Sequence, residues 1–152
     1  MSMDEYKQVF LESIDAIENI SKHLQPKMPL LSELQLTTRQ ESIMILFIRQ
    51  ENITMSEMAE RLGISKSAVS QAMNKLEKED LLIRSINENN RREITMRLGE
   101  TGIELKRQFQ AFERSIIQDY IAQLPLEDIK KVRDVIVALD RIIQQGETTK
   151  DV

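Results

Sequence analysis

The stretch TMSEMAERLGISKSAVSQAMNKLEKEDLLIR, residues 54–84, decides the fold of this chain. Thr54 followed three residues later by Glu57 is the pattern of a capping box, which opens a helix. Gly63 supplies the left-handed residue that ends this helix, and Ser65 can cap a new helix shortly after it. A short helix, a turn that contains glycine and a second capped helix predict a helix-turn-helix.

The second helix of the pair has two faces of opposite character. With a turn of about 100° per residue, its apolar side chains fall within one arc about 100° wide, which predicts a buried stripe. The stripe consists of Val69, Ala72, Met73 and Leu76. The opposite face contains no acid and consists of Ser67, Ser70, Gln71, Asn74 and Lys78. Such side chains read base edges and hold phosphates in the major groove of DNA; the alternative is a solvated face that happens to lack acids.

The amino end of this helix also suits a phosphate. Ser65 caps it, and Lys66 and Ser67 form its first turn, where backbone N–H groups have no partner within the helix. These N–H groups and the positive end of the helix dipole favour an anion. We therefore interpret it as a reader helix that lies in the major groove of DNA.

A hairpin follows the reader helix. Residues 81–86 and 93–98 alternate apolar and polar side chains and predict two strands, joined by the polar tip NENN, residues 87–90. Directly after a helix-turn-helix, such a hairpin is a wing, and arginine near its tip is favoured in the narrow minor groove of A·T-rich DNA. Arg91 and Arg92 stand there. The alternative is an exposed polar hairpin without a partner.

Further helices flank this unit. One is predicted over residues 4–24 and ends at QPKMP, because proline cannot donate to the helical hydrogen bonds. The next begins at Thr37 or Thr38, each of which starts a capping box, and its apolar run IMILFI predicts the centre of the core. After the hairpin, a helix runs to near Leu124, and a last one covers about 127–145 and ends at Gly146.

The first and last helices each carry an apolar stripe outside the compact unit of reader helix and wing. Such stripes need a partner. Packing between two chains in a dimer satisfies this need, and packing of the two helices on each other within one chain is the alternative.

Charge and composition agree with a mainly helical globular domain that meets DNA locally. The chain has 152 residues, 41% of them hydrophobic, with only 4 Gly and 3 Pro. Its net charge is −4 at pH 7, yet residues 61–97 hold 8 basic and 5 acidic side chains. The charge therefore changes sign in the segment that contains the reader helix and the hairpin.

What the sequence lacks restricts the function further. Without Cys there is no thiol nucleophile, thiol redox sensor or disulfide, and His23, the only histidine, does not make a zinc site by itself. No glycine-rich phosphate loop occurs, so we expect no enzyme, no cofactor and no metal. The run IMILFI is too short to span a membrane and no signal-peptide pattern is present, so we expect a cytoplasmic protein without a membrane partner.

Nearly the whole chain resembles the MarR family of bacterial winged helix-turn-helix regulators. The resemblance rests on residues 54–84, similar to the family's two-helix reader, and on NRREITMRLGETG, residues 90–102, similar to its wing and the start of the next helix. In the second motif Arg92 matches the wing arginine, Leu98 the family's Leu and Gly102 its Gly.

Two positions depart from this pattern. Asn90 stands where the family usually has Asp, and we expect a less rigid wing arginine, because an amide offers it only a neutral hydrogen bond. Gly99 stands where a Thr would cap the next helix, and we expect this cap to be weaker by roughly a few tenths of a kcal/mol.

The resemblance implies a mainly α fold with a small β-hairpin wing. A winged helix-turn-helix DNA-binding domain covers residues 35–102, flanked by dimerisation helices over 1–34 and 103–152. It implies a homodimer that binds a pseudo-palindromic double-stranded DNA operator, most members being repressors that respond to a small-molecule effector. The competing interpretation is a winged-helix module for protein–protein contact without DNA binding, against which the acid-free face of the reader helix argues.

The residues expected to contact DNA lie on the reader helix and near the hairpin tip. Arg92 is expected to enter the minor groove, and Arg91 to touch phosphate. The full set is Ser65, Lys66, Ser67, Ser70, Gln71, Asn74, Lys75, Lys78, Asn89, Asn90, Arg91 and Arg92. The sequence assigns no residues to an effector.

Overall fold

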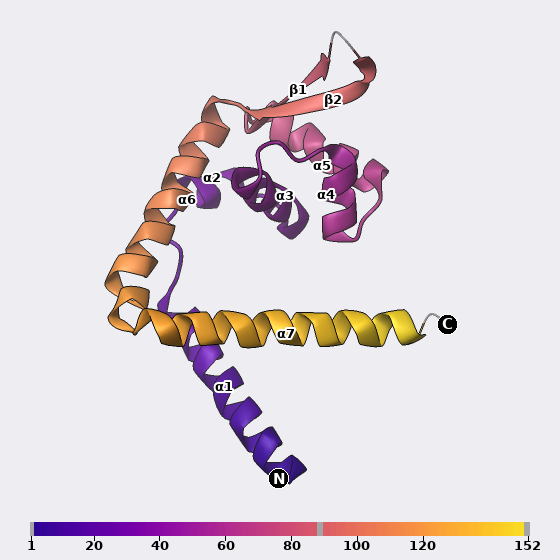
Figure 1. Ribbon diagram of the computed structural model, residues 1–152. Coiled ribbons are helices and arrows are strands. Elements are labelled where there is room, and N and C mark those ends of the chain that lie inside the picture. Colours follow the sequence, from indigo (N-terminus) through magenta and orange to yellow (C-terminus); the bar gives the residue numbers. More distant parts are fainter. Residues whose placement is uncertain (1, 88–89, 151–152) are drawn as a thin grey trace. The chain divides into compact units, whose positions relative to one another are not determined.

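The computed structural model describes residues 2–87 and 90–150, and the side chains of residues 2–86 and 94–148 (Figure 1). The chain is mainly helical with a two-stranded antiparallel hairpin, which confirms the predicted fold class. It divides into two compact units, Met1–Gln108 and Phe109–Val152. The elements are α1 (Met3–His23), α2 (Pro29–Leu34), α3 (Thr38–Arg49), α4 (Met55–Leu62), α5 (Lys66–Lys78), β1 (Leu82–Asn87), β2 (Asn90–Leu98), α6 (Glu100–Asp119), a 3-10 turn η1 (Ile121–Gln123) and α7 (Leu126–Lys150).

The core of the first unit is apolar and centres on α3, as the IMILFI run predicts. Ile43 and Phe47 of this helix are fully buried, and α3 contacts both α4 and α5. From α5 the predicted stripe is buried: Val69, Ala72, Met73 and Leu76. Among the described residues no polar or charged side chain is buried. Burial of apolar surface therefore holds α3, α4 and α5 together.

The predicted helix starts are confirmed by their caps. Thr37 and Gln40 form a complete capping box at α3. At α4 the Thr54 hydroxyl accepts a hydrogen bond from the Glu57 N–H at 3.1 Å, which is one of the two bonds of a capping box. Gly63 ends α4 in the left-handed conformation, with a φ of 65°.

Several boundaries differ from the sequence-based expectation, among them the end of α6, which lies at Asp119 and not near Leu124. Residues 25–29 do end α1, but Pro29 also opens α2, which has no counterpart among the predicted helices. Proline is favourable at this first helical position because its missing N–H would have no helical partner there. The predicted stop at Gly146 is wrong, because α7 continues to Lys150. A single glycine costs a helix about 1 kcal/mol and does not by itself end it.

The hairpin after α5 is the predicted wing-like unit. β1 and β2 pair from Leu82 with Leu98 to Ile86 with Ile94, and the register shifts before Asn87 pairs with Asn90. β2 begins at Asn90, earlier than the predicted strand 93–98. The Ser85 and Thr95 hydroxyls lie 3.0 Å apart across the strands, a cross-strand pair that supports the register.

The helices α1 and α7 expose their apolar side chains. No described residue of α1 is buried, and Phe10 is 61% exposed. In α7 the side chains of residues 126–148 are exposed apart from Ile129, which is half-buried. Within the described part of the chain, no helix has the length and apolar character required to cross a membrane.

Candidate nucleic-acid interface

The outer face of α5 presents free hydrogen-bonding groups. Lys66, Ser67, Gln71, Asn74 and Lys78 are exposed, and Ser70 is half-buried. None of these side chains makes a hydrogen bond or an ion pair with another described residue. The face is therefore available to a ligand, whereas the opposite face of the helix is buried in the core.

The first turn of α5 adds backbone donors to this face. The Ser65 hydroxyl caps the helix by accepting a hydrogen bond from the Ala68 N–H at 3.0 Å, as predicted. The N–H groups of Lys66 and Ser67 lie in the first turn and point along the helix axis without a helical acceptor. With the Lys66 ammonium beside them, they make this end of α5 electropositive.

Lys75 differs from the other predicted residues of α5. It is half-buried, and its Nζ donates a hydrogen bond to the backbone oxygen of Gln35 at 3.1 Å. Gln35 is the left-handed C-cap of α2, with a φ of 49°. A cation there stabilises the negative end of α2, so Lys75 joins the reader helix to α2.

The acid nearest to this face is neutralised by the hairpin. Glu77 of α5 forms an ion pair with Arg84 of β1, with 2.5 Å between Oε1 and Nη2. The Arg84 Nε also donates to the same oxygen at 2.7 Å. This pair ties the first strand of the wing to the reader helix and offsets a negative charge that would repel phosphate.

The residues predicted near the hairpin tip are only partly described. Asn89 lies outside the described residues. Asn90, Arg91 and Arg92 belong to the backbone of β2, while their side chains lie outside the described part.

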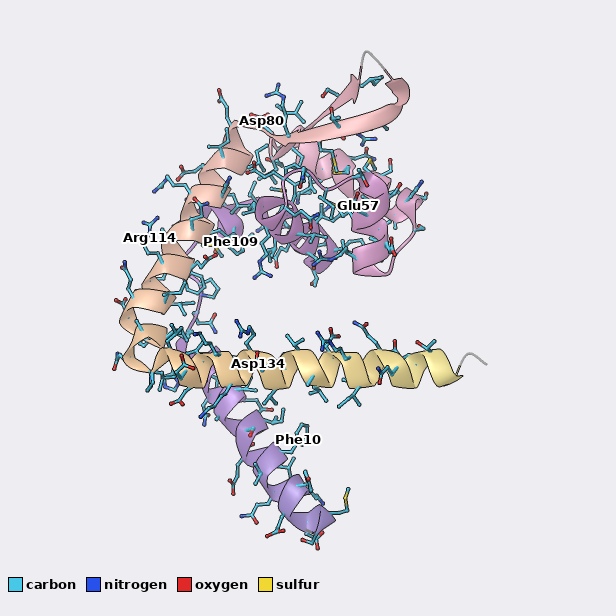
Figure 2. All side chains as sticks on the ribbon, viewed as in Figure 1. Phe10, Glu57, Asp80, Phe109, Arg114 and Asp134 are labelled. Carbon is cyan, nitrogen blue, oxygen red and sulfur yellow. The ribbon has the colours of Figure 1, made fainter. Side chains whose placement is uncertain are left out.

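Asp80 is a residue of this region that the sequence did not single out. Figure 2 labels Asp80 close to the start of α6. The Asp80 Oδ2 accepts a hydrogen bond from the Glu100 N–H at 3.1 Å, in the first turn of α6. The expectation that Gly99 leaves this helix with a weaker cap is therefore corrected, because a carboxylate from the end of α5 supplies the acceptor. An acid directly after the reader helix, combined with a glycine at an N-cap position, is the sequence signal for this arrangement.

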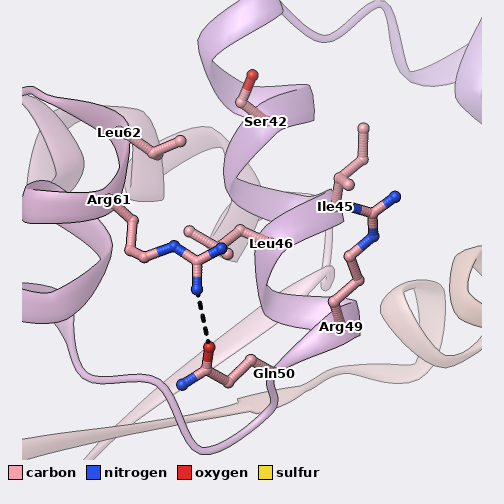
Figure 3. Close-up of a pocket in the computed structure, with 7 residues that line it drawn as sticks. All are labelled: Ser42, Ile45, Leu46, Arg49, Gln50, Arg61 and Leu62. Carbon is pink, nitrogen blue, oxygen red and sulfur yellow. Dashed lines mark hydrogen bonds between the residues drawn. The ribbon is translucent and has the colours of Figure 1, made fainter. Parts of the chain in front are cut away.

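A surface pocket of about 300 Å³ lies between α3 and α4 (Figure 3). Its lining contains no acid and consists of Ser42, Ile45, Leu46, Arg49, Gln50, Arg61 and Leu62. The Arg61 Nη1 donates to the Gln50 Oε1 at 3.3 Å. None of the predicted DNA-contacting residues lies in this pocket. In the part of the chain whose side chains are described, no three potential metal ligands lie together.

Comparison with known proteins relates this geometry to a family. Residues 36–94 match the model of the MarR family. The transcriptional regulator AdcR of Streptococcus pneumoniae is 45% identical over 51 residues, which are 34% of this chain and only 34% of that protein. The organic hydroperoxide resistance transcriptional regulator of Bacillus subtilis is 24% identical over 117 residues, which are 77% of this chain and 78% of that protein.

Solved structures share the fold. AbsC, a MarR family transcriptional regulator from Streptomyces coelicolor, has a TM-score of 0.66 at 20% identity, covering 95% of this chain and 97% of AbsC. The MepR–DNA complex from S. aureus has a TM-score of 0.54 at 18% identity, covering 88% of this chain and 96% of that chain. Residues 36–94 are thus similar to the MarR family, and the chain shares its fold with solved structures of MarR family transcriptional regulators.

Proposed function

We propose that this protein regulates transcription by binding double-stranded DNA in a sequence-specific manner, with α5 as the reader helix. The observation that carries the proposal is the outer face of α5, which is exposed, free of acids and free of intramolecular hydrogen bonds. Hydrogen-bonding side chains without an acid among them suit the base edges and phosphates of DNA. The match of residues 36–94 to the MarR family model and the MepR–DNA complex among the solved structures of the same fold support this function.

The side chains of α5 divide into two tasks. Gln71 and Asn74 carry amide groups, which form paired hydrogen bonds with the edge of an adenine and so give specificity. Lys66, Lys78 and the amino end of α5 suit phosphate, which fixes the register of the protein on the duplex. Ser65, Ser67 and Ser70 complete the contact in this proposal. Lys75 stabilises the position of the helix through its hydrogen bond to the Gln35 backbone oxygen.

The hairpin tip forms the second contact. In this proposal Arg92 enters the minor groove next to the site of α5, Arg91 touches phosphate, and Asn89 and Asn90 line the tip. The ion pair between Arg84 and Glu77 supports the proposal because it joins the wing to the reader helix. A wing attached in this way follows the reader helix onto DNA.

The protein acts as a homodimer in this proposal, with residues 35–102 as the DNA-binding domain and residues 1–34 and 103–152 as the dimerisation helices. Exposed apolar side chains support this assignment in α1, at Val9, Phe10, Ile17 and Ile20. They also support it in α7, at Val132, Val135, Ile136, Leu139 and Ile143. Surfaces of this kind are costly to leave in water.

The regulator is a cytoplasmic repressor in this proposal, released from a pseudo-palindromic operator by a small-molecule effector. Two-fold symmetry would place two reader helices on one face of DNA, which suits an operator with two half-sites about one helical turn apart. It also doubles the local positive charge, so that a protein with a net charge of −4 still binds phosphate.

Selection of genomic fragments tests this function. The purified chain is incubated with sheared DNA from the genome of origin, bound fragments are sequenced, and the enriched fragments are titrated in gel shifts. We expect a few enriched sites with inverted-repeat symmetry. The matched control is the chain with Gln71→Ala and Asn74→Ala, which keeps the fold and loses the proposed base contacts. Equal recovery of all fragments by both proteins would contradict sequence-specific binding.

A further inference from the structure

The reader helix, the hairpin and α6 meet at residues 80–81 and 99–102, where Figure 2 labels Asp80. α5 ends at Lys78, and Asp80 follows in the left-handed conformation with a φ of 56°. The Leu81 N–H then donates to the Leu76 oxygen at 2.8 Å, which closes the end of the helix. Glycine is the usual residue at such a position, and aspartate is among the few others that tolerate it.

Three hydrogen bonds join this end of α5 to the start of α6. The Asp80 Oδ2 accepts from the Glu100 N–H at 3.1 Å. The Asp80 backbone oxygen accepts from the Gly102 N–H at 3.3 Å, and the Leu81 oxygen accepts from the Gly99 N–H at 3.0 Å. We call these three bonds the wing clamp, because the hairpin leaves the clamp at Leu81 and returns to it at Gly99.

Glycine is required on the α6 side of the clamp. A Cβ atom at Gly99 would overlap the backbone oxygen and the Oδ1 of Asp80, and a Cβ atom at Gly102 would overlap the Leu81 oxygen. The usual arrangement is thus reversed. An acid stands at the left-handed end of α5, where glycine is common, and a glycine stands at the N-cap of α6, where an acid or hydroxyl is common. The Asp80 carboxylate, at the end of α5, thus accepts a hydrogen bond from the first turn of α6.

The clamp decides how the hairpin leaves the domain. A two-stranded hairpin is marginally stable by itself, so its direction depends on its attachment. Ile86 is 66% exposed and Ile94 37% exposed, so the outer part of the hairpin has little packing to hold it. The contacts at its root are the wing clamp and the ion pair between Arg84 and Glu77, which join it to α5 and α6.

We propose that Asp80 is a positioning residue: through its bond to the Glu100 N–H it fixes the wing at the angle from the reader helix at which the wing arginine reaches DNA. The inference rests on the proposed DNA-binding function. Asp80 itself does not contact DNA in this proposal, and its effect passes through Arg92.

The test is a double-mutant cycle on DNA affinity, measured in gel shifts with the selected fragment. Asp80→Gly keeps the left-handed conformation and removes the carboxylate acceptor. Asp80→Asn keeps an oxygen acceptor and the conformation but removes the charge. Glu79→Ala is the matched control, because it removes an exposed neighbouring carboxylate that makes no hydrogen bond or ion pair with the described residues, while the backbone bond of Glu79 stays.

For Asp80→Gly, the loss of negative charge alone would raise the DNA affinity, whereas the proposal predicts a lower affinity. Loss of a negative charge near DNA strengthens binding, so Glu79→Ala and Asp80→Asn should bind as tightly as the wild type or more tightly. Asp80→Gly should bind less tightly in spite of its lost charge, by about tenfold if the wing contact is lost. Rescue by Asn at the same position separates the lost hydrogen bond from the lost charge.

The double-mutant cycle tests whether the effect of Asp80 on DNA affinity depends on Arg92 of the wing. We expect Arg92→Ala to weaken binding by about tenfold in the wild type and by less than about twofold in Asp80→Gly. Gln71→Ala should have the same effect in both backgrounds, because α5 is unchanged. Thermal unfolding curves confirm that every variant is folded at the assay temperature.

The outcomes separate the two proposals. If the wild type binds no fragment above background, DNA binding itself is refuted and the positioning role with it. If the wild type binds but the effects of Asp80→Gly and Arg92→Ala multiply, or Asp80→Asn binds as weakly as Asp80→Gly, the positioning role is overturned while the proposed function stands.

Discussion

At the scale of single residues, the outer face of α5 separates the folding of the protein from its proposed task. The predicted contacts Gln71 and Asn74 are exposed and unbonded, whereas Lys75 of the same helix donates to Gln35. Helical periodicity distinguishes the buried from the exposed face and so could place the first two residues. It could not show the role of Lys75, because its partner is distant in the sequence.

Gln71→Ala or Asn74→Ala should relax the sequence preference, each at a cost of about 1–3 kcal/mol for its base. Arg92→Ala should instead weaken binding to all sequences and reduce the slope of log affinity against log salt by about 1. Gel-shift titrations of the selected fragment and of point-substituted fragments, at two salt concentrations, measure both effects. An unchanged affinity of the Arg92 variant would contradict the wing contact.

Glu104 gives a prediction about pH. The Arg107 guanidinium, which donates to its carboxylate at 2.5 and 2.9 Å, and the Gln108 amide lower the pKa of Glu104 from 4.5 to about 2. Because the folded state has the lower pKa, this group stabilises the fold above about pH 4.5 and the contribution disappears as the pH falls towards 2.

We therefore expect the free energies of unfolding of the wild type and of Glu104→Gln to differ at neutral pH and to converge as the pH falls through that range. Urea unfolding at several pH values measures the difference. Glu113→Gln is the control, because this exposed residue of α6 has no ion pair with the described residues. A difference that stays constant down to pH 2 would contradict the predicted pKa.

At the scale of elements, the sequence predicts those helices whose signals are local. The caps at Thr37, Thr54 and Ser65 each accept a hydrogen bond from a backbone N–H three residues later, and the structure confirms them. α2 lacks such signals, since Met28 provides no side-chain cap. The Leu30 N–H of α2 donates to the Gln108 Oε1 at 3.3 Å. At the other end of α2, the Gln35 backbone oxygen accepts a hydrogen bond from the Lys75 Nζ. Both partners come from other helices, so the local signal for α2 is limited to Pro29 at its first position.

The two glycines at predicted helix ends should respond oppositely to alanine. Gly146 lies inside α7, and no atom comes within 4 Å of an added Cβ. Gly146→Ala should stabilise the protein by up to about 1 kcal/mol, because alanine favours the helix. Gly63 has a φ of 65°, so Gly63→Ala should destabilise by about 1 kcal/mol or more. Thermal unfolding measures both variants; destabilisation by Gly146→Ala would show that the helix ends there.

At the scale of the whole molecule, the exposed apolar faces of α1 and α7 are the feature that most needs a partner. The sequence predicts both stripes from their spacing, because periodicity reveals which side chains share a face. It leaves open what covers them, since packing within a chain and packing between chains have the same pattern. The proposal of a homodimer decides between the two in a way that can be measured.

Ile136→Glu should convert the protein from dimer to monomer. The side chain is 60% exposed in the single chain, so the charge costs the monomer little, whereas burying it at a dimer interface is unfavourable. Sedimentation velocity at several concentrations measures the change. Ile86→Glu is the control, because Ile86 is similarly exposed at 66% but lies in the hairpin. A wild type that sediments as a monomer at all concentrations would rule out the proposed dimer.

The free side chains on the outer face of α5 also bear on how such a protein diverges. Because they contribute neither to the core nor to the intramolecular hydrogen bonds, replacing them changes the stability of the fold little. If α5 reads DNA as proposed, mutations there change the preferred DNA sequence without destabilising the fold. Under the proposed function, gene duplicates thus acquire new target sites by a few substitutions on one helix, while the scaffold that supports the helix stays the same.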